Sequence, residues 1–170
     1  MTYEVEIHTR APESLFDLRG EESTAAACLG VAGLALPDGP NRASGDGETL
    51  ACWVGPKHWL LLAPLEREDE LDASFNELVA GHLASATRLT DAYAGFEISG
   101  PDADQVLAQG CALDLHPRQA PPGLATFTEL FGARGLLYKP AEPCRYRLYV
   151  DRSLGHYVGQ WLHRAAGRNP

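Results

Sequence analysis

Short hydrophobic blocks separated by polar turns predict alternating strands and helices in the first half of the chain. Strands are expected at residues 14–20 (SLFDLRG), 49–55 (TLACWVG), 58–64 (HWLLLAP) and 86–92 (ATRLTDA). The second and third of these strands flank GPK, a sequence typical of a hairpin turn. These four blocks therefore predict a small sheet that includes one tight hairpin.

Two helices are expected between these strands. Residues 21–30 are rich in alanine and end at Gly30. In residues 68–83 the apolar positions recur at helical spacing, so that one stripe faces a core: Leu71, Phe75, Leu78, Val79 and Leu83. The resulting order β-α-β-β-α-β predicts a ferredoxin-like arrangement.

The second half begins with another strand and helix at residues 95–110. Phe96 and Ile98 alternate with polar neighbours, Pro101 fits a first helical position, and Gly110 fits the position after a helix end. Three strands follow at 124–131, 135–140 and 145–150. A closing helix, capped by Asp151 or Ser153, has these apolar residues on one face: Leu154, Tyr157, Val158, Trp161, Leu162 and Ala165.

The element order predicts an α+β protein with mainly antiparallel sheets. Residues 1–92 are expected to form a ferredoxin-like α+β lobe. Residues 93–170 are expected to form a second antiparallel α+β lobe, and the two lobes to pack as one compact unit.

Charge and hydropathy limit the classes of partner. The chain has 14 Lys and Arg against 23 Asp and Glu, a formal net charge of −9, and no basic block. Nucleic acid and anionic membranes are therefore not expected partners. The longest apolar run, WLLLAPL, is too short to span a bilayer, and the first ten residues lack the apolar core of a signal peptide. We expect a cytoplasmic protein.

The octapeptide GCALDLHP, residues 110–117, has the strongest appearance of a site. Cys111, Asp114 and His116 could ligate a metal, but three mixed ligands on one loop are an incomplete zinc site. Pro117 favours an extended His116, and Asp114 can accept backbone hydrogen bonds, so a structural turn is the favoured interpretation. The other three cysteines are scattered among small or apolar residues, as buried free thiols are.

Catalytic motifs are not evident in the sequence. It contains no Gly-x-Ser-x-Gly elbow, no GxGxxG and no GxxxxGK[ST]. His156 and His163 are seven residues apart, without the spacing of zinc-binding helices, and are interpreted as a solvated helix face. Trp53 and Trp59 bracket the hairpin turn and could complete a core, or contact a ligand or a partner.

Several stretches together resemble the gamma subunit family of heterotetrameric sarcosine oxidases. They are LALPDGPN, WVGPKHWLLLAP, ISGPDADQVLAQGCALDLHP and YVDRSLGHYVGQWL, in that order, and the likeness runs from about Leu15 to Ala166. This family is related to the folate-binding fold of aminomethyltransferases, whose strand-to-helix turn is similar to Ser99–Ala103. The resemblance thus implies that the second half has the form seen in that fold.

The resemblance also implies a role within a complex. A gamma-type subunit has no catalytic, cofactor-binding or metal-binding residue of its own. FAD, FMN, NAD, tetrahydrofolate and zinc are expected in the alpha, beta and delta subunits, with alpha in direct contact. Trp53, Trp59, Asp114, His116 and Arg118 are the candidate interface residues.

Three hypotheses about function follow. The first is a non-catalytic subunit of a complex that demethylates sarcosine oxidatively to glycine and transfers the one-carbon unit to tetrahydrofolate. The second is an independent folate-binding, aminomethyltransferase-like enzyme, which should have a deep pocket ringed by a carboxylate and aromatic residues. A scaffold for an unrelated partner is the third.

Overall fold

A computed structural model describes residues 3–168 of the chain. They divide into two compact units, one of Pro12–Thr90 and one formed by the residues up to Ala11 together with those from Asp91 onward. Residues 1–92 are expected from the sequence to form one lobe, whereas β1 (Glu6–Thr9) pairs with β7 (Tyr93–Ser99) and so belongs to the second of these units.

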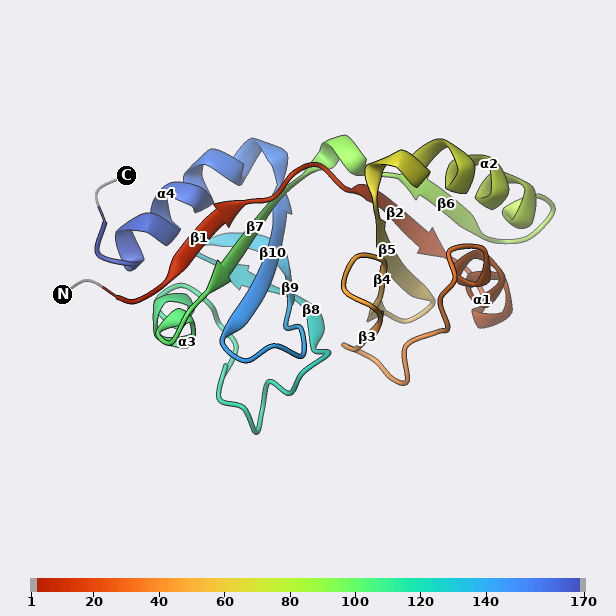
Figure 1. The fold of residues 1–170 in the computed structure, drawn as a ribbon. Helices are drawn as coiled ribbons and strands as arrows, with labels where there is room; N and C mark the ends of the chain where they lie inside the picture. Colours follow the sequence, from red (N-terminus) through yellow and green to blue (C-terminus); the bar gives the residue numbers. More distant parts are fainter. Residues whose placement is uncertain (1–2, 169–170) are drawn as a thin grey trace. The chain divides into compact units, whose positions relative to one another are not determined.

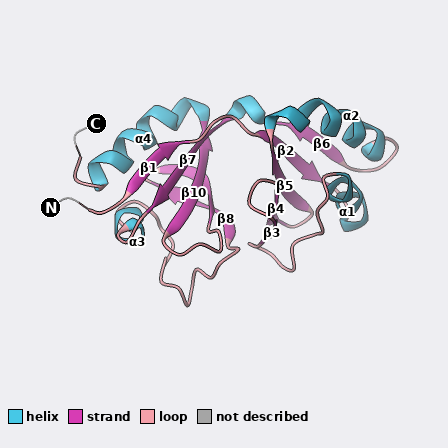
Figure 2. Cartoon of the chain, in the orientation of Figure 1, coloured by secondary structure: helices cyan, strands magenta, loops and turns pink. Residues whose placement is uncertain are grey.

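The unit Pro12–Thr90 has the predicted ferredoxin-like order. Its elements are β2 (Ser14–Arg19), α1 (Glu22–Val31), β3 (Ala43–Gly45), β4 (Leu50–Gly55), β5 (His58–Ala63), η1 (Leu65–Arg67), α2 (Glu68–Val79) and β6 (Ser85–Arg88). The strands form an antiparallel sheet in the order β3-β4-β5-β2-β6 (Figures 1 and 2). The short strand β3 was not predicted and adds an edge to the four that were.

Aromatic and aliphatic side chains fill the core of this unit. Phe16 of β2 meets Phe75 of α2 edge to face, with ring centroids 5.1 Å apart. Leu29 of α1 and Leu71 of α2 are fully buried with them. The helix α2 ends at Val79, before its predicted end, and Leu83 is fully exposed. The helical spacing thus identified the buried stripe and overestimated its length.

The second unit combines the start of the described chain with its second half. Its elements are β1, β7, α3 (Ala103–Leu107), β8 (Ala125–Leu130), β9 (Ala133–Tyr138), β10 (Arg145–Asp151), η3 (Arg152–Leu154) and α4 (Gly155–Ala165), and the short helix η2 (Thr90–Ala92) crosses the boundary between the units. Its antiparallel sheet has the order β1-β7-β10-β9-β8. The helix predicted from Pro101 to Gly110 is shorter than expected. It begins two residues after Pro101 and ends three residues before Gly110.

Both units repeat one topology. In the first, β2 lies between β5 and β6; in the second, β7 lies between β10 and β1. Gly20 follows β2 with a φ of +146°, and Gly100 follows β7 with a φ of +120°. A Cβ on Gly20 would lie 2.7 Å from Ala84 Cβ, and one on Gly100 would lie 2.6 Å from Glu4 O, so each turn fits closely against the residues before its flanking strand. The start of the chain therefore supplies the strand that β6 supplies in the other unit.

Candidate functional site along the closing helix

The helix α4 presents three different faces. Its buried face consists of Gly155, Val158, Leu162 and Ala165. Glycine at two positions lets the helix approach β7 closely: a Cβ on Gly155 would lie 2.8 Å from Ala94 Cβ, and one on Gly159 would lie 3.2 Å from Phe96 Cε1. Small residues on the helix thus fix how it lies on the sheet, and with it the direction of the other two faces.

A second face of α4 and the turn before it is apolar and exposed. Leu154, Tyr157 and Trp161 retain 39%, 43% and 40% of their accessible surface. The rings of Tyr157 and Trp161 lie edge to face, with centroids 6.3 Å apart, and the Arg164 guanidinium carbon lies 5.4 Å from the Trp161 ring centroid. The six apolar positions predicted to share one face therefore divide into a buried half and an exposed half.

A pocket of about 610 Å³ borders this exposed face. Tyr157, Trp161 and Arg164 line it from α4, and Gly110, Cys111 and Phe131 are among the residues that line it from outside the helix. Phe131 has a left-handed φ of 51° in the turn between β8 and β9, and its ring packs directly on Gly110, where a Cβ would lie 2.1 Å from Phe131 Cδ1. Burial raises the pKa of the Cys111 thiol, which disfavours the reactive thiolate.

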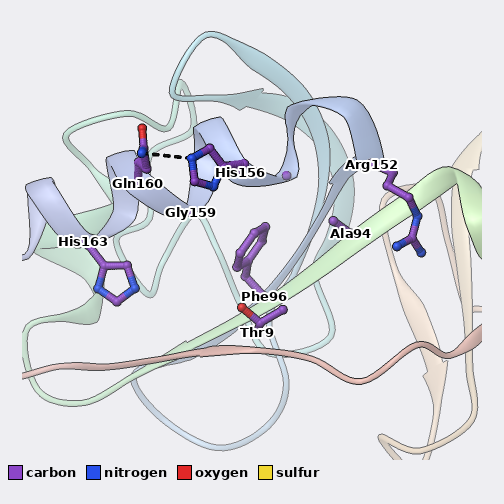
Figure 3. A pocket seen from close by; sticks show the side chains of 9 residues that line it. Thr9, Ala94, Phe96, Arg152, His156, Gly159, Gln160 and His163 are labelled. Atoms are coloured by element: carbon purple, nitrogen blue, oxygen red, sulfur yellow. Dashed lines mark hydrogen bonds between the residues drawn. The ribbon is translucent and has the colours of Figure 1, made fainter. Parts of the chain in front are cut away.

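A second pocket, of about 570 Å³, lies along the polar face of α4 (Figure 3). His156, Gln160 and His163 line it from the helix, and Phe96 and Thr9 line it from the strands. Gln160 Nε2 and His156 Nε2 are 3.0 Å apart and form a hydrogen bond. The two histidines predicted to lie on a solvated face therefore share a pocket wall, with His156 exposed and His163 half-buried.

The surface charge of α4 differs from that of the chain as a whole. Residues 152–170 contain three arginines and no Asp or Glu, although the net charge is −9. Arg152 is held by backbone carbonyls, with Nε 2.6 Å from Asp91 O and Nη2 3.0 Å from Tyr93 O. Among the described residues lining the two pockets, only Glu129 carries a carboxylate. The closing helix and the residues that flank it thus carry three arginines without an acidic residue, beside the exposed aromatic rings of Tyr157 and Trp161.

The predicted turn around residues 110–118 has the geometry of an exposed polar connection. His116 N donates to Asp114 Oδ1 over 2.9 Å, and Arg118 N donates to His116 Nδ1 over 3.3 Å. Leu115 and Ala120 are buried and anchor the turn, while Asp114, His116 and Arg118 are exposed. The structure brings these three predicted residues together on one loop, with their polar groups accessible to a partner.

The two tryptophans of the hairpin have different environments, and the prediction for Trp59 requires correction. Trp53 and Trp59 lie opposite each other on β4 and β5, with ring centroids 5.8 Å apart. Trp53 is half-buried, and its indole nitrogen donates to Gly55 O over 2.8 Å. Trp59 is completely buried in the core of its unit, so it cannot contact a partner directly.

Sequence reasoning missed Arg164 and Gln160. Arg164 lies three residues after Trp161 and seven after Tyr157, a spacing that places all three on one side of a helix. This spacing can be seen in the sequence. The sequence does not show, however, which side of the helix packs on the sheet and which side stays exposed.

Within residues 3–168, no group of three His, Cys, Asp or Glu side chains is placed to hold a metal ion. None of the helices that these residues form is long and apolar enough to cross a membrane.

Comparison with known proteins gives consistent results. The family model described as sarcosine oxidase, gamma subunit family, matches residues 19–168. The sarcosine oxidase subunit gamma of Corynebacterium sp. (strain P-1) is 32% identical over 138 residues, which cover 81% of this chain. The matched segment spans only 66% of that relative's length.

Solved structures extend the likeness to the fold. A chain of the heterotetrameric sarcosine oxidase from Corynebacterium sp. U-96, in complex with pyrrole 2-carboxylate, matches with a TM-score of 0.87 and 25% identity, covering 96% of this chain and 84% of that one. Aminomethyltransferase T of the glycine cleavage system from Bartonella henselae matches with a TM-score of 0.70 and 14% identity, covering 95% and 46%. The second match shows the shared fold alone, as predicted from the sequence. On the family match, the chain belongs to the sarcosine oxidase gamma subunit family.

Proposed function

We propose that this chain is a non-catalytic subunit of a heterotetrameric sarcosine oxidase complex. The observation that carries the proposal is the match of 96% of the chain, at a TM-score of 0.87, to a chain of a heterotetrameric sarcosine oxidase. In this proposal the complex demethylates sarcosine oxidatively to glycine and passes the one-carbon unit to tetrahydrofolate. The chain contributes binding surface to the assembly rather than reacting groups.

The cofactors belong to the partner subunits in this proposal. FAD, FMN, NAD, tetrahydrofolate and zinc are held by the alpha, beta and delta subunits, and alpha contacts this chain directly. The assembly works in the cytoplasm. The exposed apolar stripe on α4 supports a subunit role, because aromatic side chains on a protein surface commonly mark a protein contact.

The turn with Asp114, His116 and Arg118 is proposed as a polar part of the contact, and Trp53 as a further contact. The turn offers a carboxylate, an imidazole and a guanidinium in one exposed loop. Interfaces surround their apolar centres with such polar groups. In this proposal Trp59 does not contact the partner. It packs against Trp53, with the two ring centroids 5.8 Å apart, and so helps to hold the Trp53 ring in place.

Co-expression with the alpha, beta and delta subunits of a heterotetrameric sarcosine oxidase tests the proposal. We expect a complex that contains this chain and survives gel filtration. Arg118→Ala should lower the amount of this chain in the complex without changing its own unfolding midpoint. Arg88→Ala, at an exposed arginine of the other unit, is the matched control and should have no effect on assembly. Failure of the wild-type chain to associate with any of the three subunits would contradict the proposal.

A further inference from the structure

The side chains of Tyr157, Trp161 and Arg164, here called the α4 anchor, are exposed together on one stripe of α4. Tyrosine, tryptophan and arginine are the residue types that contribute most to binding energy at protein interfaces. In the anchor they already contact one another, with Tyr157 edge to face on Trp161 and Arg164 over the Trp161 ring. These contacts hold the side chains in one arrangement before a partner arrives, which lowers the entropy lost on binding.

Arg164 indicates the chemistry of that partner. Within residues 3–168, the Arg164 guanidinium has no ion-pair partner, whereas Arg10, Arg19, Arg88, Arg145 and Arg147 each pair with at least one carboxylate. Residues 152–170 contain no Asp or Glu that could pair with it along the helix. A carboxylate from another molecule could form an ion pair with this guanidinium, which already lies over the Trp161 ring.

The adjacent pocket indicates the shape of that partner. It has a volume of about 610 Å³, enough for one or two large side chains, and Phe131 and Cys111 line it beside the anchor. An apolar side chain that enters this pocket would lie beside the aromatic rings of the anchor. Any carboxylate near it in sequence could then reach Arg164.

We propose that the α4 anchor docks a segment of a partner subunit that carries an apolar side chain next to an Asp or Glu. The proposal rests on the proposed function and specifies the surface and the chemistry of the contact. A second copy of this chain is a poorer occupant, because a symmetric pairing of α4 with α4 would bring two Arg164 guanidiniums together, and residues 152–170 contain no Asp or Glu to pair with them. The charge of the helix, opposite to that of the chain as a whole, favours an acidic partner.

Binding of α4 variants to the co-expressed partner subunits tests the proposal. Trp161→Ala and Arg164→Glu should each raise the dissociation constant about tenfold or more. Arg164 is exposed, so Arg164→Glu should barely change the unfolding midpoint of the isolated chain, whereas Trp161→Ala, at a side chain that is 40% exposed, should lower it modestly without preventing folding. Leu65→Ala is the matched control, because Leu65 is 41% exposed and lies in the other unit, and it should leave the affinity unchanged.

Salt dependence adds an independent measurement. The affinity of the wild-type chain should fall as the salt concentration rises, and Arg164→Gln should reduce this dependence because it removes the charge that the partner carboxylate meets. A salt dependence that is the same in wild type and Arg164→Gln would contradict the docking chemistry.

The remaining outcomes separate this proposal from the proposed function. If the wild-type chain assembles and Trp161→Ala and Arg164→Glu assemble equally well, the docking proposal is overturned and the subunit role stands. If the wild-type chain does not assemble, the subunit role fails and the docking proposal fails with it. If the isolated chain dimerises and Trp161→Ala abolishes the dimer, a second copy is the occupant and the proposal is wrong.

Discussion

Arg10, which follows β1, donates from Nη1 to Oε2 of Glu97 on β7 over 3.1 Å. Two more guanidiniums approach the same carboxylate from β10, with Arg147 Nε at 3.4 Å and Arg145 Nε at 3.5 Å. The Glu97 side chain is only 15% exposed. Three arginines therefore pair with one carboxylate where three neighbouring strands of the second unit meet.

Replacement of Glu97 should destabilise the protein strongly. Glu97→Gln keeps the shape of the side chain but removes the negative charge with which all three guanidiniums pair, at an expected cost of about 2 kcal/mol or more in unfolding free energy. Urea unfolding of the two proteins measures this. Glu66→Gln, at an exposed carboxylate, serves as the control and should change stability by no more than about 0.5 kcal/mol. Equal stability of Glu97→Gln and wild type would show that the cluster is energetically unimportant.

Stability should fall at alkaline pH because of Cys52 in β4. Complete burial raises the pKa of its thiol to about 12, from an ordinary value of 9.0. A raised pKa in the folded state means that the unfolded state loses its proton first, so the stabilisation is complete below about pH 9 and is lost between about pH 9 and 12. The stability difference between wild type and Cys52→Ala should therefore shrink by about 1 kcal/mol from pH 8 to pH 10. A difference independent of pH would be inconsistent with a buried neutral thiol.

Replacement by alanine should have opposite effects on stability at two glycines, Gly110 and Gly30. Gly110→Ala would place a methyl group 2.1 Å from Phe131 Cδ1. This clash can be relieved only if the Phe131 ring moves, and Phe131 lies in a tight turn with a left-handed φ. We therefore expect the unfolding free energy to fall by about 1–3 kcal/mol. Gly30→Ala in α1 meets nothing within 4 Å and should be neutral or stabilise the helix by up to about 1 kcal/mol. Thermal unfolding of the two variants provides the comparison, and a Gly110→Ala protein as stable as wild type would argue against the close packing of Phe131 on Gly110.

The two ends of the described chain lie close together, so we expect the protein to tolerate circular permutation. Tyr3 N donates to Ala166 O over 3.2 Å, and Arg168 bonds to the carbonyl of Val5, so the two ends of the described chain are neighbours. A chain that starts at Pro12 and carries residues 1–11 after residue 170, joined by a short Gly/Ser linker, should fold with a native circular dichroism spectrum. The same chain without residues 1–11 should lose most of its stability, because β7 would lose a paired neighbour. An equally stable truncated chain would show that β1 is dispensable.

The sequence predicts features that depend on contacts between residues close together in the chain. It does not predict features that depend on contacts between distant residues. The hairpin of β4 and β5, and the buried stripe of α2 with Leu71 and Phe75, depend on neighbours nearby in the chain and were predicted correctly. The pairing of β1 with β7 joins Glu6 to Ser99, and no local pattern specifies a partner so distant.

Burial within a recognised pattern was harder to assign than the pattern itself. Trp53 and Trp59 are cross-strand neighbours with similar surroundings in sequence, yet only Trp59 is completely buried. On α4, Val158 is buried while the adjacent Tyr157 is exposed, because Gly155 and Gly159 determine how the helix lies against β7. Which half of an apolar face is covered therefore depends on packing between elements, and that decides which residues remain available to a partner.

The subunit role is tested most directly by assaying sarcosine oxidation and one-carbon transfer to tetrahydrofolate with the isolated chain, with the partner subunits alone, and with the reconstituted complex. The account predicts no activity of either kind from the isolated chain, and full activity only from the complex that contains it. Oxidation of sarcosine, or transfer of a one-carbon unit to tetrahydrofolate, by the purified chain alone would contradict the account and favour an independent folate-dependent enzyme.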